Sequence, residues 1–197
     1  MKNVNQNGRS MVEMLGVLAI IGVLSAGGLA GYSKAMFKHK LNTTMDQITM
    51  LVTNIRTMYG TQGDYTGLDN EAAVNLGIVP AVMGSGATLT NPFKGGVKIV
   101  TADAKTASTA GNTGFVVAYD SLPREACIAL ATADFGSGAG SGFIGVNVLN
   151  DGTVAANIDA TKASTAIGTN EGKALDMSAA ISDCADGSKN AVVWKFY

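Results

Sequence analysis

The sequence predicts an α+β protein in which a long N-terminal α-helix packs on a head built from an antiparallel β-sheet. Three observations predict this class. An uncharged, apolar run extends from residue 14 to residue 32. Apolar residues at helical spacing follow it as far as Tyr59. Beyond them come short apolar or β-branched runs separated by Gly, Pro, Asn and Asp, as is typical of strands and turns.

The composition favours one modest domain beyond the apolar run. The chain has 197 residues, of which 15% are charged and 25 are glycine. Its formal net charge is −1, so the charge balance does not favour nucleic acid as a partner. A domain usually has about 100–200 residues. We therefore divide the chain into a polar leader (1–8), an apolar half-helix (9–32), an amphipathic half-helix (33–59) and a globular head (60–197).

The apolar run is long enough to cross a membrane. As a helix, residues 14–32 would rise about 28 Å, close to the roughly 30 Å of a bilayer's hydrocarbon core. Glu13 lies at the start of the run. A charge deep in a membrane helix costs about 3 kcal/mol, and less near the interface. We therefore expect Glu13 to have a partner, although a simple membrane anchor with an interfacial glutamate is the alternative.

A short polar leader that ends in Gly8, followed after four residues by Glu13 and then by the apolar run, resembles the N-terminus of type IV prepilins. In that family a dedicated peptidase cuts after the glycine and N-methylates the new first residue. The resemblance implies cleavage between Gly8 and Arg9 and methylation of Arg9. The chain departs from the family at this position, where the first mature residue is usually Phe, Met or another apolar residue.

The resemblance also implies that Glu13 acts in assembly. In pilins the glutamate of one subunit is paired with the N-terminal amine of its neighbour. Two opposite charges about 4 Å apart, with an effective dielectric constant near 20, attract by about 4 kcal/mol. Such a pair would align each helix with the next in the core of a filament.

Two features of the apolar helix leave alternatives open. Gly27 and Gly31 form a G-x-x-x-G pair, which can let helices approach closely. The glycines could also soften the helix, or simply face lipid. Lys34, Lys38 and Lys40 follow the run, and the positive-inside count alone would place the head in the cytoplasm. Long domains translocate largely regardless of charge, however, and the prepilin-like leader favours a periplasmic head.

The helix continues beyond the membrane with an amphipathic stripe that we expect to form part of the head's core. Its members recur every three or four residues: Phe37, Leu41, Met45, Ile48, Val52, Ile55 and Tyr59. Most polar residues of the segment, Arg56 among them, fall off this stripe. Gly60 is a C-cap signal that ends the helix.

The head is predicted to combine short helices with strands. Asp69 or Asn70 caps a helix that reaches Leu76, and strands are expected over roughly 94–101 and 114–120. A helix over 121–130 has Ser121 or Leu122 as its cap and Pro123 in its first turn. The remaining elements are a hairpin of 143–149 with 153–158 across Asn150-Asp151-Gly152, a helix over 176–184 and a final strand over 191–197.

Two cysteines, Cys127 and Cys184, lie in the head. An even count fits one disulfide in an oxidising compartment, and closing so long a loop would stabilise the fold by about 4 kcal/mol in the chain-entropy model. Two buried free thiols are the alternative. The outline of the head is similar to type IVb pilins, which implies a disulfide-closed C-terminal region. The short leader is more like type IVa pilins and the pseudopilins of type II secretion.

The sequence indicates no catalytic site, metal site or cofactor. The single histidine, His39, lies among lysines at the membrane boundary, without a second histidine for a Ser-His-Asp site or a metal cluster. The glycine-rich segment 136–142 lacks the Gly-Lys-Ser/Thr ending of a phosphate loop. We interpret it as a flexible connection.

These observations favour a structural protein over an enzyme. We expect a prepilin in the bacterial inner membrane with its head in the periplasm. The peptidase trims it, and the pilus machinery assembles it with identical copies into an extracellular helical filament. A minor pilin or a type II secretion pseudopilin is one alternative. An alternative of another class is a membrane-anchored extracytoplasmic binding module, which would keep its leader and stay monomeric.

Overall fold

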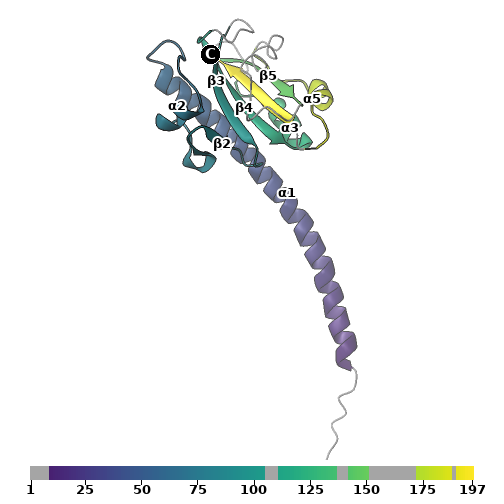
Figure 1. The fold of residues 1–197 in the computed structure, drawn as a ribbon. Helices are drawn as coiled ribbons and strands as arrows, with labels where there is room; N and C mark the ends of the chain where they lie inside the picture. The colour runs from purple at the N-terminus through teal and green to yellow at the C-terminus, as the bar shows by residue number, and fades with distance from the viewer. Residues whose placement is uncertain (1–8, 105–110, 137–141, 151–171, 188–189) are drawn as a thin grey trace, which may run out of the picture. The chain divides into compact units, whose positions relative to one another are not determined.

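The structure, a computed structural model, describes residues 9–104, 111–136, 142–150, 172–187 and 190–197 (Figure 1). The chain forms two compact units, residues 1–40 and residues 41–197. The first unit contains the N-terminal part of helix α1 (Arg9–Tyr59). The second unit, the head, contains the remainder of α1 and every other described helix and strand.

Helix α1 has 51 residues and ends where the sequence predicts. The Gly60 N–H donates to the Arg56 carbonyl oxygen over 2.8 Å. A Cβ at position 60 would lie 2.7 Å from that oxygen, so the chain can leave the helix in this way only because residue 60 is glycine.

The predicted stripe on α1 is confirmed within the head. Ile48, Val52, Ile55 and Tyr59 are buried, and Leu41 and Met45 pack against the same core. Leu51 is also fully buried, although it lies outside the predicted stripe. A helix that faces a sheet buries a band wider than a narrow seam, which accounts for Leu51.

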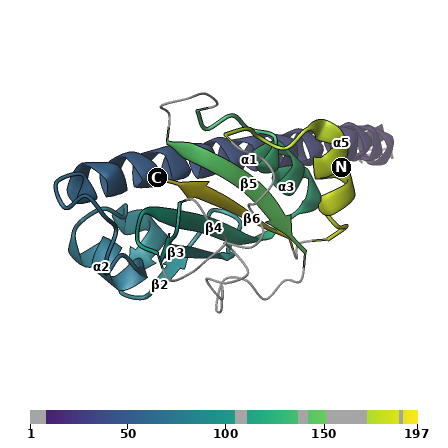
Figure 2. The same cartoon turned by 90° about the horizontal axis from the view of Figure 1, so that it is seen from above.

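The head contains one six-stranded antiparallel sheet with the order β1-β2-β3-β4-β6-β5. Its strands are β1 (Gly84–Ser85), β2 (Thr88–Thr90), β3 (Gly96–Ala102), β4 (Gly114–Leu122), β5 (Phe143–Leu149) and β6 (Asn190–Phe196). The last strand, β6, therefore lies between β4 and β5 (Figure 2). All of its residues are buried, so the C-terminal segment is a central element of the fold.

The two faces of the sheet differ in the size of their side chains. The face toward α1 carries large residues, including Phe115, Tyr119, Trp194 and Phe196. The other face has a separate cluster of smaller residues: Ala102, Val116, Ala118, Ala191 and Val193. Because neighbouring residues of a strand point to opposite faces, β4 is apolar in consecutive positions from Phe115 to Tyr119 and β6 from Ala191 to Trp194.

Two register shifts bring additional residues onto the α1 face. One lies between Tyr119 and Leu122 on β4 and the other between Phe143 and Gly145 on β5. A bulge of this kind changes the alternation of the strand. As a result, Leu122 joins the same core cluster as Tyr119, and Val146 joins the same cluster as Phe143.

The predicted start of the helix after β4 is wrong. Ser121 and Leu122 belong to β4, and helix α3 runs from Arg124 to Ala131 with Pro123 as its N-cap. Ser121 has a φ of +54°, and Leu122 still pairs with Asn190 of β6. Strand pairing in the core therefore prevails over the local preference of Ser for a helix cap.

The other short helices agree with the sequence. Asp69 caps α2 (Asn70–Asn75) by accepting a hydrogen bond from the Ala72 N–H over 2.7 Å. Asp176 caps α5 (Met177–Asp183) in the same way, with the Ala179 N–H as donor over 2.8 Å. The short helix η1 (Ala81–Met83) and strands β1 and β2 were not predicted. The predicted strand 153–158 lies outside the described residues.

Candidate assembly site

The N-terminal part of α1 presents an apolar surface on all sides. Every residue from 11 to 35 is exposed. The exposed large apolar side chains between residues 11 and 32 are Met11, Val12, Met14, Leu15, Val17, Leu18, Ile20, Ile21, Val23, Leu24, Leu29 and Tyr32. By length and composition α1 is able to cross a membrane, and its most apolar window is not buried at all by the chain itself. A helix that is apolar all round belongs in a membrane or in the core of an assembly.

Glu13 is the acidic residue on this surface. It is exposed, and within the described part of the chain it has no ion pair. The helix begins at Arg9, four residues before Glu13. Gly8, the other residue of the expected cleavage site, lies outside the described residues. A partner for Glu13 from another molecule, as the sequence predicts, is compatible with this position.

The glycines of the apolar segment have no role in packing within the subunit. A Cβ added to Gly16, Gly22, Gly27, Gly28 or Gly31 would meet nothing within 4 Å. Glycine inside a helix costs about 1 kcal/mol relative to alanine. If these positions serve close packing, that packing involves another molecule.

The basic residues at the end of the apolar segment lie on the same helix. Lys34, Lys38 and His39 are exposed, and Lys40 is half-buried. On this helix the exposed apolar surface is therefore followed directly by an exposed basic surface.

The C-terminal part of the head is closed by a disulfide between Cys127 of α3 and Cys184, the C-cap of α5. The two Cα atoms are 6.0 Å apart, and both residues are buried. The sequence left open whether the two cysteines form a disulfide or remain free thiols, and in the structure they form a disulfide. It joins the segment before β6 to the helix after β4.

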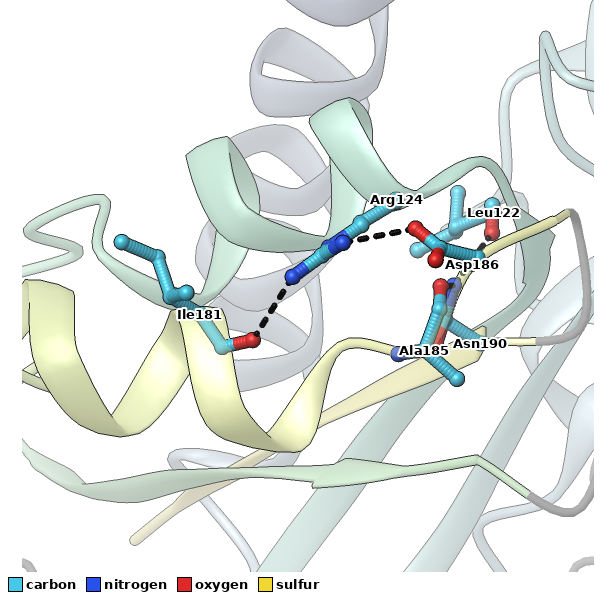
Figure 3. Close-up of polar contacts among 6 residues, drawn as sticks. All are labelled: Leu122, Arg124, Ile181, Ala185, Asp186 and Asn190. Atoms are coloured by element: carbon cyan, nitrogen blue, oxygen red, sulfur yellow. Dashed lines mark hydrogen bonds and ion pairs between the residues drawn. The ribbon is translucent and has the colours of Figure 1, made fainter.

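Polar contacts join residues that lie close in sequence to the two cysteines (Figure 3). Arg124 Nη1 lies 2.6 Å from Asp186 Oδ1, and Arg124 Nη2 donates to the Ile181 carbonyl oxygen over 3.2 Å. This pair is solvent-accessible, because the Arg124 and Asp186 side chains are 39% and 89% exposed. Exposed ion pairs contribute little to stability, usually less than about 1 kcal/mol.

Asn190 is the buried polar residue of the same region. Its Oδ1 accepts from the Ala185 N–H over 2.7 Å, and its Nδ2 donates to the Ala185 and Leu122 carbonyl oxygens over 2.9 and 3.1 Å (Figure 3). One side chain therefore holds the turn after α5 against the end of β4. Nothing in the sequence singled out Asn190, because its partners are set by strand pairing.

A cavity of about 330 Å³ lies between α1 and the segment after α3. Its lining includes Thr49, Thr53, Arg56, Phe135 and Phe196. The guanidinium carbon of Arg56 is 5.4 Å from the centre of the Phe196 ring, within the range of a cation–π contact. Arg56 falls off the predicted apolar stripe, yet it packs on the core through this contact.

Arg56 also affects Tyr65. Burial raises the pKa of the Tyr65 hydroxyl, and the nearby positive charge of Arg56 opposes that rise. The same ring lies 4.8 Å from the ring centre of Phe115 and 5.8 Å from that of Tyr59. These aromatic contacts attach the segment after α1 to the sheet.

Comparison with known proteins identifies relatives over most of the chain. The family described as PilS N terminal matches residues 38–196. The major structural subunit of the bundle-forming pilus of Escherichia coli O111:H- is 28% identical over 167 residues, which are 82% of this chain and 83% of that protein. The subunit of the same name from Escherichia coli O127:H6 (strain E2348/69 / EPEC) matches with the same identity and coverage.

The comparison with solved structures matches two pilins. The type IV b pilin from Salmonella typhi is 19% identical, with a TM-score of 0.49 over 78% of this chain and 97% of that chain. TcpA, a type IV pilin from Vibrio cholerae El Tor biotype, is 15% identical, with a TM-score of 0.44 over 81% of this chain and 99% of that chain.

Proposed function

The chain belongs to the PilS family of type IV pilins, and we propose that it is the major repeating subunit of a pilus filament. The observation that carries the proposal is the fully exposed apolar surface of α1 over residues 11–32. The subunit does not cover this surface, so lipid or other copies must do so. The relatives named as major structural subunits support the main repeating role over that of a minor pilin. Members of this family are structural subunits and not enzymes.

Before assembly, the apolar half of α1 spans the inner membrane once and the head lies in the periplasm. The length and composition of α1 support this placement, as does the disulfide, which fits an oxidising compartment. After export the apolar surface would be exposed to water, at a cost of about 1.5–3 kcal/mol for each large apolar side chain. Packing α1 helices from many copies together removes that cost and makes them the core of the filament.

Processing prepares the N-terminus for this packing. The prepilin peptidase cuts between Gly8 and Arg9 and methylates the new N-terminus at Arg9. The freed amine of one copy then pairs with Glu13 of its neighbour. An isolated carboxylate in an apolar core is strongly unfavourable, so a subunit that is out of alignment is rejected. In this proposal apolar burial supplies affinity and the Glu13 pair supplies register, while the assembly machinery inserts the subunits.

Mass spectrometry of subunits from sheared surface filaments tests the proposal. We expect a subunit that begins at Arg9 and carries one methyl group on its amine. Gly8→Phe should accumulate as a membrane precursor that is heavier by the leader, whereas the neighbouring Asn7→Ala should be processed normally. Filaments built from subunits that retain residues 1–8 would contradict the proposal.

The abundance of the chain in those filaments separates the related roles. A major pilin should be the main protein of the sheared fraction. A minor pilin or a secretion pseudopilin would be a trace component or absent, and a membrane-anchored binding module would stay monomeric in the membrane.

A further inference from the structure

The basic residues that follow the apolar segment have no role in the assembly mechanism above. We propose that Lys34 and Lys38 bind the headgroups of anionic phospholipids in the outer leaflet of the inner membrane while the subunit waits to be assembled. This inference rests on the proposed function, because it requires the head to lie in the periplasm. Both lysines are exposed on α1 and belong to the same compact unit as the apolar segment.

The charge distribution around the apolar segment is unfavourable for this orientation. Lys2 and Arg9 precede the segment, whereas Lys34, Lys38 and Lys40 follow it. Removal of the leader takes Lys2 away, so the excess of basic residues on the periplasmic side of the segment increases. Cations near the end of a membrane helix normally favour the cytoplasmic side. Anionic lipid headgroups are a source of negative charge at that depth, and binding them offsets this unfavourable charge distribution.

The positions of the two lysines along α1 match the phosphate layer. With Tyr32 at the edge of the hydrocarbon, a rise of 1.5 Å per residue places the backbone of Lys34 about 3 Å and that of Lys38 about 9 Å farther out. The headgroup layer is about 5–8 Å thick on each side of the bilayer. The backbone of Lys34 thus lies within that layer and the backbone of Lys38 at its outer edge. Tyr32 is an aromatic residue at the end of the apolar run, and Tyr is enriched at membrane interfaces.

The two lysines also share one side of the helix. Residues four apart have Cβ atoms about 5–6 Å from each other, so both ammonium groups can reach one phosphate. Gly31 and Gly27 lie on the same side, about one and two turns closer to the membrane centre, respectively. A Cβ at either glycine would meet nothing within 4 Å, which leaves room for the acyl chain of the lipid whose headgroup the lysines hold.

The test uses the full-length chain in vesicles made of phosphatidylglycerol and phosphatidylethanolamine. The chain is purified in mild detergent, and mass spectrometry gives the ratio of the two lipids that remain bound. We expect phosphatidylglycerol to be enriched over its share in the vesicles. Each lysine near a membrane surface contributes a preference of about fivefold. The double variant Lys34→Gln with Lys38→Gln should lose most of the enrichment, and Lys34→Arg with Lys38→Arg should retain it.

A matched control carries the same change of charge on the head. Lys94 and Lys173 are exposed there, and Lys94→Gln with Lys173→Gln should bind lipid as the wild type does. Resistance to carbonate extraction shows whether each variant remains in the membrane. If the double Gln variant is inserted and equally enriched in phosphatidylglycerol, the inference is wrong. The same holds if its lipid ratio is unchanged while its filament yield falls, because the lysines then act on other subunits.

Protease digestion of spheroplasts separates this inference from the function on which it rests. Digestion of the head from outside, with no lipid preference, would overturn the lipid site alone. Protection of the head inside the cell would overturn the proposed topology, and with it the assignment to the outer leaflet.

Discussion

Gly142 lies directly against the guanidinium group of Arg56. A Cβ built on Gly142 would be 2.8 Å from Arg56 Cζ and 2.8 Å from the Tyr197 carbonyl oxygen. The Tyr197 N–H donates to the Gly142 carbonyl oxygen over 2.8 Å, and Arg56 lies over the Phe196 ring. Gly142, the residue before β5, thus contacts both α1 and the C-terminal residue. A side chain at position 142 would have no space.

Replacement of this glycine should destabilise the head through two effects. Gly142 has a φ of +74°, and alanine in that conformation costs about 1 kcal/mol. Overlap with Arg56 and Tyr197 should raise the total for Gly142→Ala to about 2–4 kcal/mol. Gly63→Ala is the matched control, because Gly63 has a φ of +78° and open space around its Cβ position. Equal shifts of the urea midpoint for the two variants would show that overlap contributes nothing.

Asn190 and Arg124 should differ sharply in their contributions to stability. Asn190→Ala leaves one buried backbone group of Leu122 and two part-buried ones of Ala185 without their partner, and we expect a loss of about 2–3 kcal/mol. Arg124→Ala breaks an exposed pair with Asp186 and should cost less than about 1 kcal/mol. Denaturant unfolding of both variants measures the difference. A larger loss of stability for Arg124→Ala than for Asn190→Ala would show that the ion pair, and not Asn190, is the main stabilising contact of this region.

The disulfide should contribute a few kcal/mol. Cys127 and Cys184 are 57 residues apart in sequence, and the chain-entropy model gives about 4 kcal/mol for a loop of that size. We expect Cys127→Ala with Cys184→Ala to lower the free energy of unfolding by up to about that amount. A reductant should destabilise the wild type similarly and leave the double variant unchanged. If the reductant lowers the stability of both proteins equally, its effect does not come from reduction of the Cys127–Cys184 disulfide.

Tyr119 should make the head sensitive to alkaline pH. The side chain is fully buried, and burial raises the pKa of its hydroxyl above the ordinary value near 10. The group therefore stays protonated in the folded state, while it ionises near pH 10 in the unfolded state. The stability of the head is therefore independent of this group below pH 10 and falls as the pH rises above 10, because ionisation then favours the unfolded state.

Tyr119→Phe should remove that dependence and make the loss of stability above pH 10 shallower. The buried hydroxyl has no hydrogen-bond partner among the described residues. At neutral pH the variant should therefore equal the wild type or exceed it by about 1–3 kcal/mol. Tyr197→Phe, at an exposed position, should change neither quantity. A Tyr119→Phe protein that is less stable at pH 7 would reveal a partner for the hydroxyl.

Glu13 is expected to matter for assembly and not for membrane insertion. Glu13→Ala removes a pair worth about 4 kcal/mol, so each subunit addition should weaken by about a thousandfold. The variant should accumulate in the membrane fraction, and sheared filaments should be absent. Met14→Ala, at the next position of the same exposed surface, should still assemble. A normal yield of filaments from Glu13→Ala would show that Glu13 does not align the subunits during assembly.

Several parts of the head could be predicted because their signals are local. Asp69 and Asp176 lie three residues before the amides that they cap, so a short window of sequence contains both partners. Strand β5 was likewise visible as a short run beside the turn signal Asn150-Asp151-Gly152, and the apolar stripe of α1 was visible as a pattern of period 3.6. The start of α3 was mispredicted because Ser121 has a cap-like sequence but belongs to a bulged strand that pairs with the distant Asn190.

The sequence by itself determined the long helix, its division into an apolar and an amphipathic half, and the resemblance to pilins, since each depends on residues close together in the chain. The tertiary structure alone decided that β6 lies between β4 and β5, that Asn190 holds Leu122 and Ala185 together, and that Gly142 faces Arg56. Apart from Asn190 and Ala185, which are five residues apart, these contacts join segments tens of residues apart. A periodic pattern records which side of a strand is buried, but it does not record which strand will lie beside it.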